Sequence, residues 1–215
     1  MNIIISCEGN IGSGKSTLLS ILQSSTKFTD KDIVFVNEPV EEWYKIHDSN
    51  GKNIFEKFYE SPEKYAYPFQ ELTLMSRYTK IKDAISDNPN KIIISERSVF
   101  SDHYIFAKMM YDKGYISDME YQIYKHNANI IKKELCFSKY IYIRTSSDKC
   151  IERITKRNRC GENITNDYIK LCEKYHDDWL LNMDNILIIN GDEEFENNIE
   201  RQNNILNQIY DFILT

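Results

Sequence analysis

The stretch Gly9-Asn10-Ile11-Gly12-Ser13-Gly14-Lys15-Ser16-Thr17 decides the fold of this chain. It matches the phosphate-binding pattern G-x-x-x-x-G-K-[ST] and follows the short apolar run Ile3–Cys7. Glycines let backbone N–H groups surround phosphate oxygens, and the helix that follows adds the positive end of its dipole. Lys15 supplies a cation for the β- and γ-phosphates, and the Ser16 hydroxyl is placed to bind Mg²⁺. Residues 9–17 therefore predict a site for a nucleoside triphosphate with magnesium.

Four more apolar, β-branched runs follow along the chain and predict the remaining strands. They do not alternate polar with apolar residues, which is typical of strands covered on both faces in a parallel sheet. Strands that alternate with helices indicate βαβ crossovers. We therefore expect an α/β fold of the P-loop NTPase type, with a doubly wound five-stranded parallel sheet and helices on both faces. Strands are expected at Ile3–Cys7, Ile33–Val36, Ile92–Ser95, Tyr140–Ile143 and Ile186–Ile189, and helices at Ser16–Ser25, Tyr65–Asp87, Ser98–Lys113, Asp118–Leu135, Asp148–Arg157, Asn166–Asn182 and Phe195–Leu214.

Length and charge limit the classes of protein that fit. The chain has 215 residues, and we expect a single domain over residues 1–215. Its 27 Lys and Arg against 33 Asp and Glu give a formal net charge of −6, which provides no basic surface for nucleic acid. No apolar stretch approaches the roughly 18 residues that cross a bilayer, so no membrane partner is expected.

The cysteines give a prediction about the compartment. The five cysteines form no Cys-x-x-Cys pair, so a disulfide framework or a structural zinc site is disfavoured. His176 lies four residues after Cys172, a spacing that a metal can use, but no further soft ligands lie nearby and ordinary packing is the preferred interpretation. The chain starts Met-Asn-Ile-Ile-Ile without a charged or Arg/Ser-rich presequence. We expect a cytoplasmic protein in a reducing compartment.

Charged residues follow the second and third predicted strands, where ligands bind in this architecture. Pro39 favours an extended backbone at Glu38, whose carboxylate can point into the crevice and accept a proton from an attacking hydroxyl. Glu96 can hold Mg²⁺ through water, and Arg97 can neutralise charge on the transferring group. A solvated turn acid and a surface ion pair are the alternative interpretations.

A second group of polar residues predicts a pocket for a base. Gln70, Thr73 and Arg77 fall at i, i+3 and i+7 on one helix face. An amide and a guanidinium two turns apart can bind the polar edge of a base, and Asp102 and Phe106 on the following helix can add a carboxylate and a stacking ring. Aromatic residues are more often core than ligand contacts, so the polar residues carry this prediction.

Three arginines after the fourth strand predict a lid at about residues 153–163. Arg153 and Arg157 share a helix face, and Arg159 follows them. Arginines on a closing segment can stabilise the spread negative charge of phosphates. A solvated basic face is the alternative, but the acidic character of the whole chain weakens it.

These motifs together resemble the deoxyribonucleoside kinases of the deoxycytidine/deoxyguanosine kinase branch, over nearly the whole chain. The resemblance implies transfer of the γ-phosphoryl of ATP, or of another nucleoside triphosphate, to the 5′-hydroxyl of a deoxynucleoside, with Mg²⁺, in nucleotide salvage. It also implies a homodimer. It rests on Glu8-Gly9-Asn10-Ile11 with the phosphate-binding loop, Glu38-Pro39-Val40-x-x-Trp43, Tyr59-Glu60-x-Pro62-Glu63, Phe69-Gln70, Glu96-Arg97-Ser98-Val99-x-Ser101-Asp102 with Tyr104-Ile105-Phe106, and the arginine lid.

The resemblance also implies roles for individual residues. Glu38 would activate the 5′-hydroxyl, Arg97 would orient that hydroxyl and the γ-phosphate, and Glu96 would be the acid on the magnesium side. Asp167 takes the place of the family's glutamate that shares the 3′-hydroxyl, and it is a shorter acid. On the nucleoside side, Gln70 would hydrogen-bond the base, Phe106 would stack on it, and Tyr59 would hold the 3′-hydroxyl. The walls of this pocket would be Trp43, Phe69, Ile11 and Val40. On the donor side, Glu194 and Phe195 would lie beside the adenine.

Arg77 and Asp102 bear on the preferred base. Members of the family that use thymidine tend to have smaller or apolar groups at these positions. An Arg–Asp pair leaves no room for a thymine methyl group and suits a base edge with amino or oxo groups. The resemblance therefore favours deoxycytidine and purine deoxynucleosides over thymidine.

Two rival functions stay open at this point. A nucleoside-monophosphate kinase of the thymidylate kinase type shares the fold and the loop, but it needs extra cations for an acceptor phosphate that Glu38 would repel. The other rival is a P-loop protein that binds nucleotide without phosphorylating a small molecule. The chain has no Asn-Lys-x-Asp motif for guanine, and the residues on the acceptor side argue against a mere switch.

Overall fold

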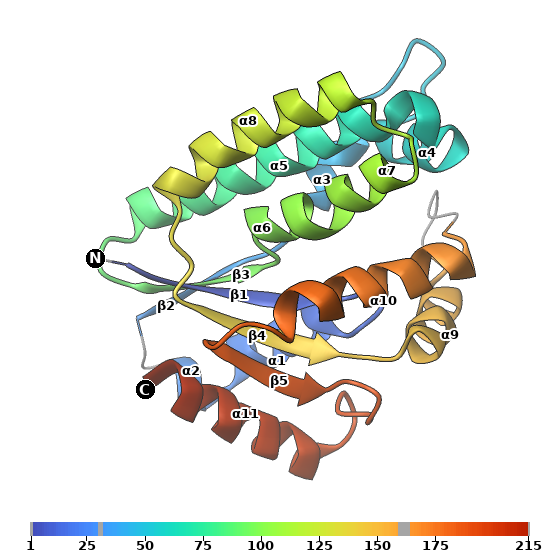
Figure 1. Ribbon diagram of the computed structural model, residues 1–215. Coiled ribbons are helices and arrows are strands. Elements are labelled where there is room, and N and C mark those ends of the chain that lie inside the picture. Colours follow the sequence, from blue (N-terminus) through green and yellow to red (C-terminus); the bar gives the residue numbers. More distant parts are fainter. Residues whose placement is uncertain (1, 30–31, 159–163, 215) are drawn as a thin grey trace.

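Five parallel strands form one sheet with the order β2-β3-β1-β4-β5. The structure is a computed structural model, and it describes residues 2–29, 32–158 and 164–214 (Figure 1). The predicted parallel α/β sheet is confirmed, and the strand boundaries agree with the expected ones to within two residues. The strands are β1 (Ile3–Gly9), β2 (Ile33–Val36), β3 (Ile92–Glu96), β4 (Lys139–Arg144) and β5 (Ile186–Asn190).

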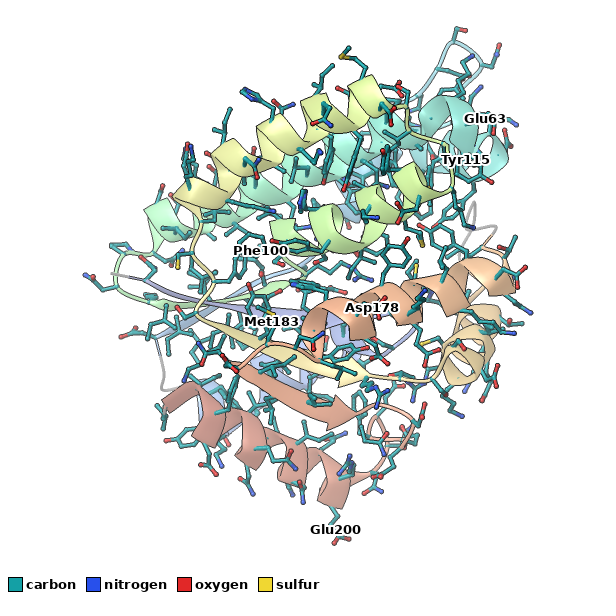
Figure 2. The ribbon with its side chains drawn as sticks, viewed as in Figure 1. Glu63, Phe100, Tyr115, Asp178, Met183 and Glu200 are labelled. Atoms are coloured by element: carbon teal, nitrogen blue, oxygen red, sulfur yellow. The ribbon has the colours of Figure 1, made fainter. Side chains whose placement is uncertain are left out.

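Helices cover both faces of the sheet, which explains why the strand sequences do not alternate. Neighbouring strand residues point to opposite faces and both are buried: Ile93 joins one core cluster and Ile94 the other. The first cluster packs under α5 (Pro62–Asp87), α8 (Asp118–Glu134) and α10 (Asn166–Leu180), and the second under α1 (Lys15–Ser24) and α11 (Ile199–Leu214). Figure 1 shows α5 and α8 side by side above the sheet and α11 below it. Side chains such as Phe100 fill the space between the upper helices and the sheet (Figure 2).

The helices depart from the sequence prediction in several places. Three short helices were not predicted: α2 (Thr26–Thr29), α3 (Val40–Tyr44) and α4 (Ile54–Glu60). The helix predicted from Phe195 begins at Ile199 instead, after a loop, while α9 (Ser147–Arg157) matches its prediction to within one residue.

The single helix expected over Ser98–Lys113 is interrupted. Its parts are α6 (Val99–Ser101), a π-helix η1 (Asp102–Ala107) and α7 (Lys108–Asp112). A π-helix bonds each residue five positions back and widens the turn, and such segments occur often at functional sites.

The sheet order brings the predicted functional segments to one edge. The strands β2, β3 and β1 are neighbours, and all are parallel, so their carboxyl ends meet. Glu38 follows β2, Glu96 ends β3, and the phosphate-binding loop follows β1. Within residues 2–29, 32–158 and 164–214, no helix is both long and apolar enough to span a bilayer.

Candidate active site

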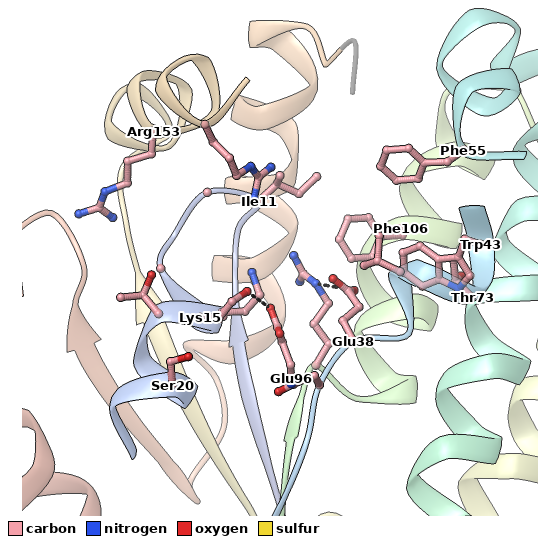
Figure 3. Close-up of a pocket in the computed structure, with 18 of the residues that line it drawn as sticks. Ile11, Lys15, Ser20, Glu38, Trp43, Phe55, Thr73, Glu96, Phe106 and Arg153 are labelled. Carbon is pink, nitrogen blue, oxygen red and sulfur yellow. Dashed lines mark hydrogen bonds and ion pairs between the residues drawn. The ribbon is translucent and has the colours of Figure 1, made fainter. Parts of the chain in front are cut away.

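A cavity of about 950 Å³ opens at the carboxyl ends of β1, β2 and β3. Figure 3 shows Lys15, Glu96 and Glu38 in the middle of this cavity, with Arg153 on one side and Trp43 on the other. The cavity therefore has a cationic half, formed by the loop and α9, and an aromatic half, formed by α3, α4 and α5.

Backbone angles require glycine at two positions of the phosphate-binding loop, and a close backbone contact adds to this at the first of them. Gly9 has φ 151°, and a Cβ atom there would lie 2.7 Å from the Ile143 carbonyl oxygen. Gly14 has φ 103°, and a Cβ atom there would lie 3.0 Å from Cζ of Phe195. Both angles are unfavourable for residues with a side chain. The buried Phe195 ring thus packs against the loop, on the side where the donor base is expected.

Lys15 is buried at the base of the loop. Its ammonium donates hydrogen bonds to the carbonyl oxygens of Gly9, at 3.1 Å, and of Asn10, at 2.7 Å. Burial, together with the positive charge of Arg97, lowers the pKa of Lys15 to about 8. In the free protein, Lys15 therefore loses its positive charge at a lower pH than an exposed lysine does.

Ser16 and Glu96 come together beside Lys15. The Ser16 hydroxyl donates a hydrogen bond of 2.7 Å to Oε1 of Glu96, and both residues line the cavity. Hydroxyl and carboxylate oxygens are ligands that suit Mg²⁺. Across the described part of the chain, no group of three or more His, Cys, Asp and Glu side chains could hold a metal ion. A magnesium ion here would depend on phosphates and water for its other ligands.

Glu38 lies between two guanidinium groups. Its Oε1 accepts a hydrogen bond of 2.9 Å from Nη2 of Arg77 and lies 3.4 Å from Nε of Arg97. Burial alone would raise the pKa of Glu38, but the two arginines outweigh it and lower the pKa to about 2. Glu38 is therefore a carboxylate throughout the physiological pH range.

Arg77 is more deeply buried than its predicted role as a base contact requires. Its Nε donates to Oδ2 of Asp102 at 2.8 Å, Nη2 to Oδ1 at 3.3 Å, and Nη1 to the Glu96 carbonyl oxygen at 3.2 Å. Arg77 is 2% exposed and Asp102 1%. Burial raises the pKa of Asp102, although Arg77 opposes this shift. The predicted Arg77–Asp102 pair is present, and it is joined to Glu38.

Arg97 adopts an unfavourable backbone conformation that the surrounding hydrogen bonds hold in place. Its φ is 64°, which costs a residue with a side chain about 1–3 kcal/mol. Its N–H donates to the Cys7 carbonyl oxygen at 2.9 Å, and its own carbonyl accepts from the Ser95 hydroxyl at 2.8 Å. The guanidinium lies over the Phe106 ring, 4.8 Å from the centroid. This turn directs Arg97 into the cavity.

Aromatic rings wall the other half of the cavity. Trp43 packs edge-on against Phe69, with 5.6 Å between ring centroids, and its indole N–H donates to the Ser76 hydroxyl at 2.9 Å. Gln70 is 2% exposed and also lines this aromatic half of the cavity, the aromatic recess. Among the described residues, its Oε1 finds no hydrogen-bond partner. A buried amide oxygen without a partner indicates that a ligand completes this recess.

Most of the predicted site residues line the cavity, and three of the phosphate-binding loop do not. Asn10 donates to the Ile169 carbonyl oxygen at 2.9 Å and accepts from the Ile11 N–H at 2.8 Å, so its side chain joins the loop to α10. The lining comprises Ile11, Gly12, Gly14, Lys15, Ser16, Thr17, Glu38, Val40, Trp43, Tyr59, Phe69, Gln70, Thr73, Arg77, Glu96, Arg97, Asp102, Phe106, Arg153, Arg157, Glu194 and Phe195, whereas Gly9, Asn10, Ser13 and Asp167 lie outside it.

The lid arginines are placed only in part. Nη1 of Arg153 donates to the Ser13 carbonyl oxygen at 3.2 Å, so Arg153 rests on the phosphate-binding loop. Arg157 is exposed and lines the cavity at the end of α9. Arg159 lies outside the described residues.

Four aromatic residues line the cavity without having been predicted, and Tyr44 at the end of α3 is one of them. Phe55 and Phe58 come from α4, and Tyr168 follows the predicted Asp167 on α10. A signal for α4 exists in the sequence, because Asn53 and Glu56 form a capping box at its start. Tyr168 lies at the cavity while Asp167 is exposed, because successive residues of a helix point in different directions.

Comparison with known proteins agrees with this geometry. A family model described as deoxynucleoside kinase matches residues 5–214. The chain is 39% identical to a fowlpox virus protein named "Probable deoxycytidine kinase", over 97% of this chain and 87% of that protein. It is 31% identical to deoxycytidine kinase 2 of Gallus gallus and 29% identical to the mitochondrial deoxyguanosine kinase of Xenopus laevis, in each case over 97% of this chain and 89% of the relative. The chain belongs to the deoxynucleoside kinase family.

Proposed function

We propose that this kinase transfers the γ-phosphoryl of ATP, or of another nucleoside triphosphate, in line to the 5′-hydroxyl of a deoxynucleoside. One observation carries the proposal. The carboxylate of Glu38 lies in the same cavity as Lys15 and Ser16 of the phosphate-binding loop, beside an aromatic recess in which the amide oxygen of Gln70 has no partner. The carboxylate accepts the hydroxyl proton while the loop holds the phosphates.

Each charged residue of the cavity has a separate role in phosphoryl transfer. Lys15 holds the β- and γ-phosphates, and Arg97 with the lid arginines Arg153 and Arg157 stabilises charge on the transferring group. Ser16 and Glu96 would hold Mg²⁺, which neutralises phosphate charge when bound. Their direct contact of 2.7 Å supports a shared role for these two residues.

The recess takes the nucleoside. Gln70 hydrogen-bonds the base through its amide, whose oxygen has no partner in the protein; Phe106 stacks on the base, and Tyr59 holds the 3′-hydroxyl. Asp167 is exposed and reaches the sugar only if α10 moves inward. Glu194 and Phe195 lie beside the donor base, a placement supported by the contact of Phe195 with Gly14.

The Arg77–Asp102 pair predicts the substrate preference. We expect kcat/KM for deoxycytidine, deoxyadenosine or deoxyguanosine to exceed that for thymidine at least about tenfold, because the buried pair leaves no room for the thymine methyl group. A panel of deoxynucleosides in one phosphoryl-transfer assay measures this. Deoxyuridine is the matched control, since it differs from thymidine only by that methyl group.

The same assay tests the rival functions. Deoxynucleoside monophosphates offered as acceptors should give no product above background, because the Glu38 carboxylate repels the phosphate group of the acceptor. Preferential phosphorylation of monophosphates would contradict the proposed function, as would triphosphate hydrolysis that no deoxynucleoside stimulates. Comparable kcat/KM for thymidine and for the other deoxynucleosides would contradict the substrate preference alone.

Lys15 predicts a pH dependence of donor binding. With a pKa of about 8, Lys15 is mostly charged at pH 7 and mostly neutral at pH 9 in the free enzyme. Because only the charged form binds phosphate well, we expect the Kd for the triphosphate to rise about tenfold from pH 7 to pH 9. Equilibrium titration with a fluorescent ATP analogue measures it. The Kd for the deoxynucleoside serves as control, and an equal change in both constants would contradict the assignment.

We further propose a cytoplasmic homodimer. Cys7, Cys136, Cys150 and Cys172 are free thiols, which supports a reducing compartment. On the outer side of α8, Met119, Ile123 and Ile130 are exposed, and a second copy of the chain would bury them.

A further inference from the structure

His176 lies behind Arg97 and was predicted only as a packing residue. It comes from the middle of α10, is fully buried, and does not line the cavity. Its Nε2 lies 3.2 Å from Nη1 of Arg97, and its Nδ1 lies 2.6 Å from the carbonyl oxygen of Cys172, one turn earlier in the helix. Both ring nitrogens are therefore in hydrogen-bonding contact.

The two partners determine the tautomer of the ring. A carbonyl oxygen only accepts, so Nδ1 of His176 must carry a proton and donate to Cys172. A guanidinium only donates, so Nε2 must be unprotonated and accept from Arg97. The imidazole is therefore neutral, as a matter of hydrogen-bond geometry.

The rings around His176 fix its orientation. It stacks nearly parallel on Tyr142, with 6.2 Å between centroids and 6° between planes, and it meets the Phe106 ring edge-on at 6.2 Å. Phe106 in turn lies under the Arg97 guanidinium. Arg97 is thus contacted at Nε by Glu38, at Nη1 by His176 and on its face by Phe106.

The charges that face His176 keep it neutral. Burial lowers its pKa well below the usual value, and the positive charges of Arg97 and Lys15 lower it further. The carbonyl oxygens of Cys172 and Gly9 favour the protonated ring, but they do not outweigh these effects.

We propose that His176 is a positioning residue that holds the Arg97 guanidinium in place as a neutral acceptor. The proposal rests on the proposed function of Arg97 at the transferring phosphoryl group. The two arginines beside Glu38 differ in this respect: Arg77 donates to the carboxyl group of its ion-pair partner Asp102, whereas Arg97 donates to the neutral ring of His176. Glu38 already lies beside Nε, so a second carboxylate behind Arg97 would cancel more of its charge, and an apolar group would leave Nη1 without an acceptor. A neutral imidazole holds the guanidinium and keeps its charge available for the transition state.

The test compares two substitutions of His176. His176→Phe keeps a ring against Tyr142 and removes the acceptor, so we expect kcat to fall about 10- to 100-fold, with the KM for deoxynucleoside changed less than about threefold. His176→Gln keeps a neutral acceptor and should recover most of the loss. Melting temperatures report whether the variants fold. A His176→Phe enzyme with the wild-type kcat, or a His176→Gln enzyme as impaired as His176→Phe, overturns the proposal.

A double-mutant cycle with Arg97→Lys separates positioning from general damage. If His176 acts through Arg97, His176→Phe lowers kcat in the wild-type background and has little further effect in the Arg97→Lys background. If the double variant instead loses kcat by the product of the two single factors, His176 has a purely structural role and the proposal is overturned. An Arg97→Lys enzyme with full activity would instead contradict the proposed function of Arg97.

A measurement on the unchanged enzyme keeps the proposal testable if the variants do not fold. ¹⁵N NMR of labelled histidine should show an unprotonated Nε2 and a protonated Nδ1 for His176 at pH 7. The Nε2–H tautomer or an imidazolium at this pH overturns the proposal.

Discussion

Glutamine in place of Glu38 is expected to lower kcat by about 10²- to 10⁴-fold, the usual contribution of a positioned proton acceptor. The amide has nearly the shape of the carboxylate but does not accept the 5′-hydroxyl proton. The aromatic recess and Gln70 are untouched by the change, so the Kd for the deoxynucleoside should stay within a few-fold. Single-turnover phosphoryl transfer and equilibrium binding measure the two quantities separately.

The low pKa of Glu38 shapes how this carboxylate works. At about 2, the pKa makes it a weak base that is always ionised. In a loose transition state the hydroxyl becomes acidic only as the phosphoryl group arrives, so a weak base that orients the hydroxyl is sufficient. Protonation of Glu38 removes its negative charge only as the pH falls toward 2. We therefore expect no acid limb from Glu38 between pH 5 and pH 8.

Glu42→Gln is the matched control. Glu42 lies four residues further along, on α3, is exposed, and does not line the cavity. It makes the same change of charge near the same strand, and kcat should change less than about twofold. Equal effects of Glu38→Gln and Glu42→Gln on kcat would remove Glu38 from the mechanism.

The sequence was most informative where function depends on the ends of strands. The apolar runs located all five strands, and the phosphate-binding loop, Glu38 and Glu96 follow three of them directly. These residues come together because neighbouring parallel strands end at one edge, a consequence of topology that needs no knowledge of side-chain packing.

Contacts between distant helices could not be predicted in this way. Arg77 was expected at the edge of the base, and the structure shows that it also bonds Glu38, a contact that depends on how α5 crosses the sheet. From the sequence, the spacing of Cys172 and His176 offered only a metal site or ordinary packing. In the structure, the imidazole of His176 lies in hydrogen-bonding contact with Arg97, which comes from another part of the chain. The π-helix likewise has no clear signature in the residues from Asp102 to Ala107.

Arg77→Leu is expected to destabilise the fold by about 3–5 kcal/mol, because it leaves Asp102 buried without its ion-pair partner. For a chain of this size, such a loss lowers Tm by about 6–20 °C. Arg77→Leu combined with Asp102→Val should recover most of this stability, since removing both charges also removes their desolvation cost. Thermal and urea unfolding of the single and double variants measure the difference.

Lys82→Leu is the matched control for this prediction. Lys82 lies on the same helix, and its ammonium contacts Glu134 at 2.7 Å, but the two side chains are 52% and 46% exposed. Water screens such a pair, so its loss should cost less than about 1 kcal/mol. The two ion pairs have nearly equal lengths and differ mainly in burial, so burial alone should separate the two results. Two outcomes would contradict the prediction that Arg77 and Asp102 form a desolvated ion pair beside Glu38. One is an equal loss of unfolding free energy in Arg77→Leu and Lys82→Leu, and the other is a double variant no more stable than Arg77→Leu.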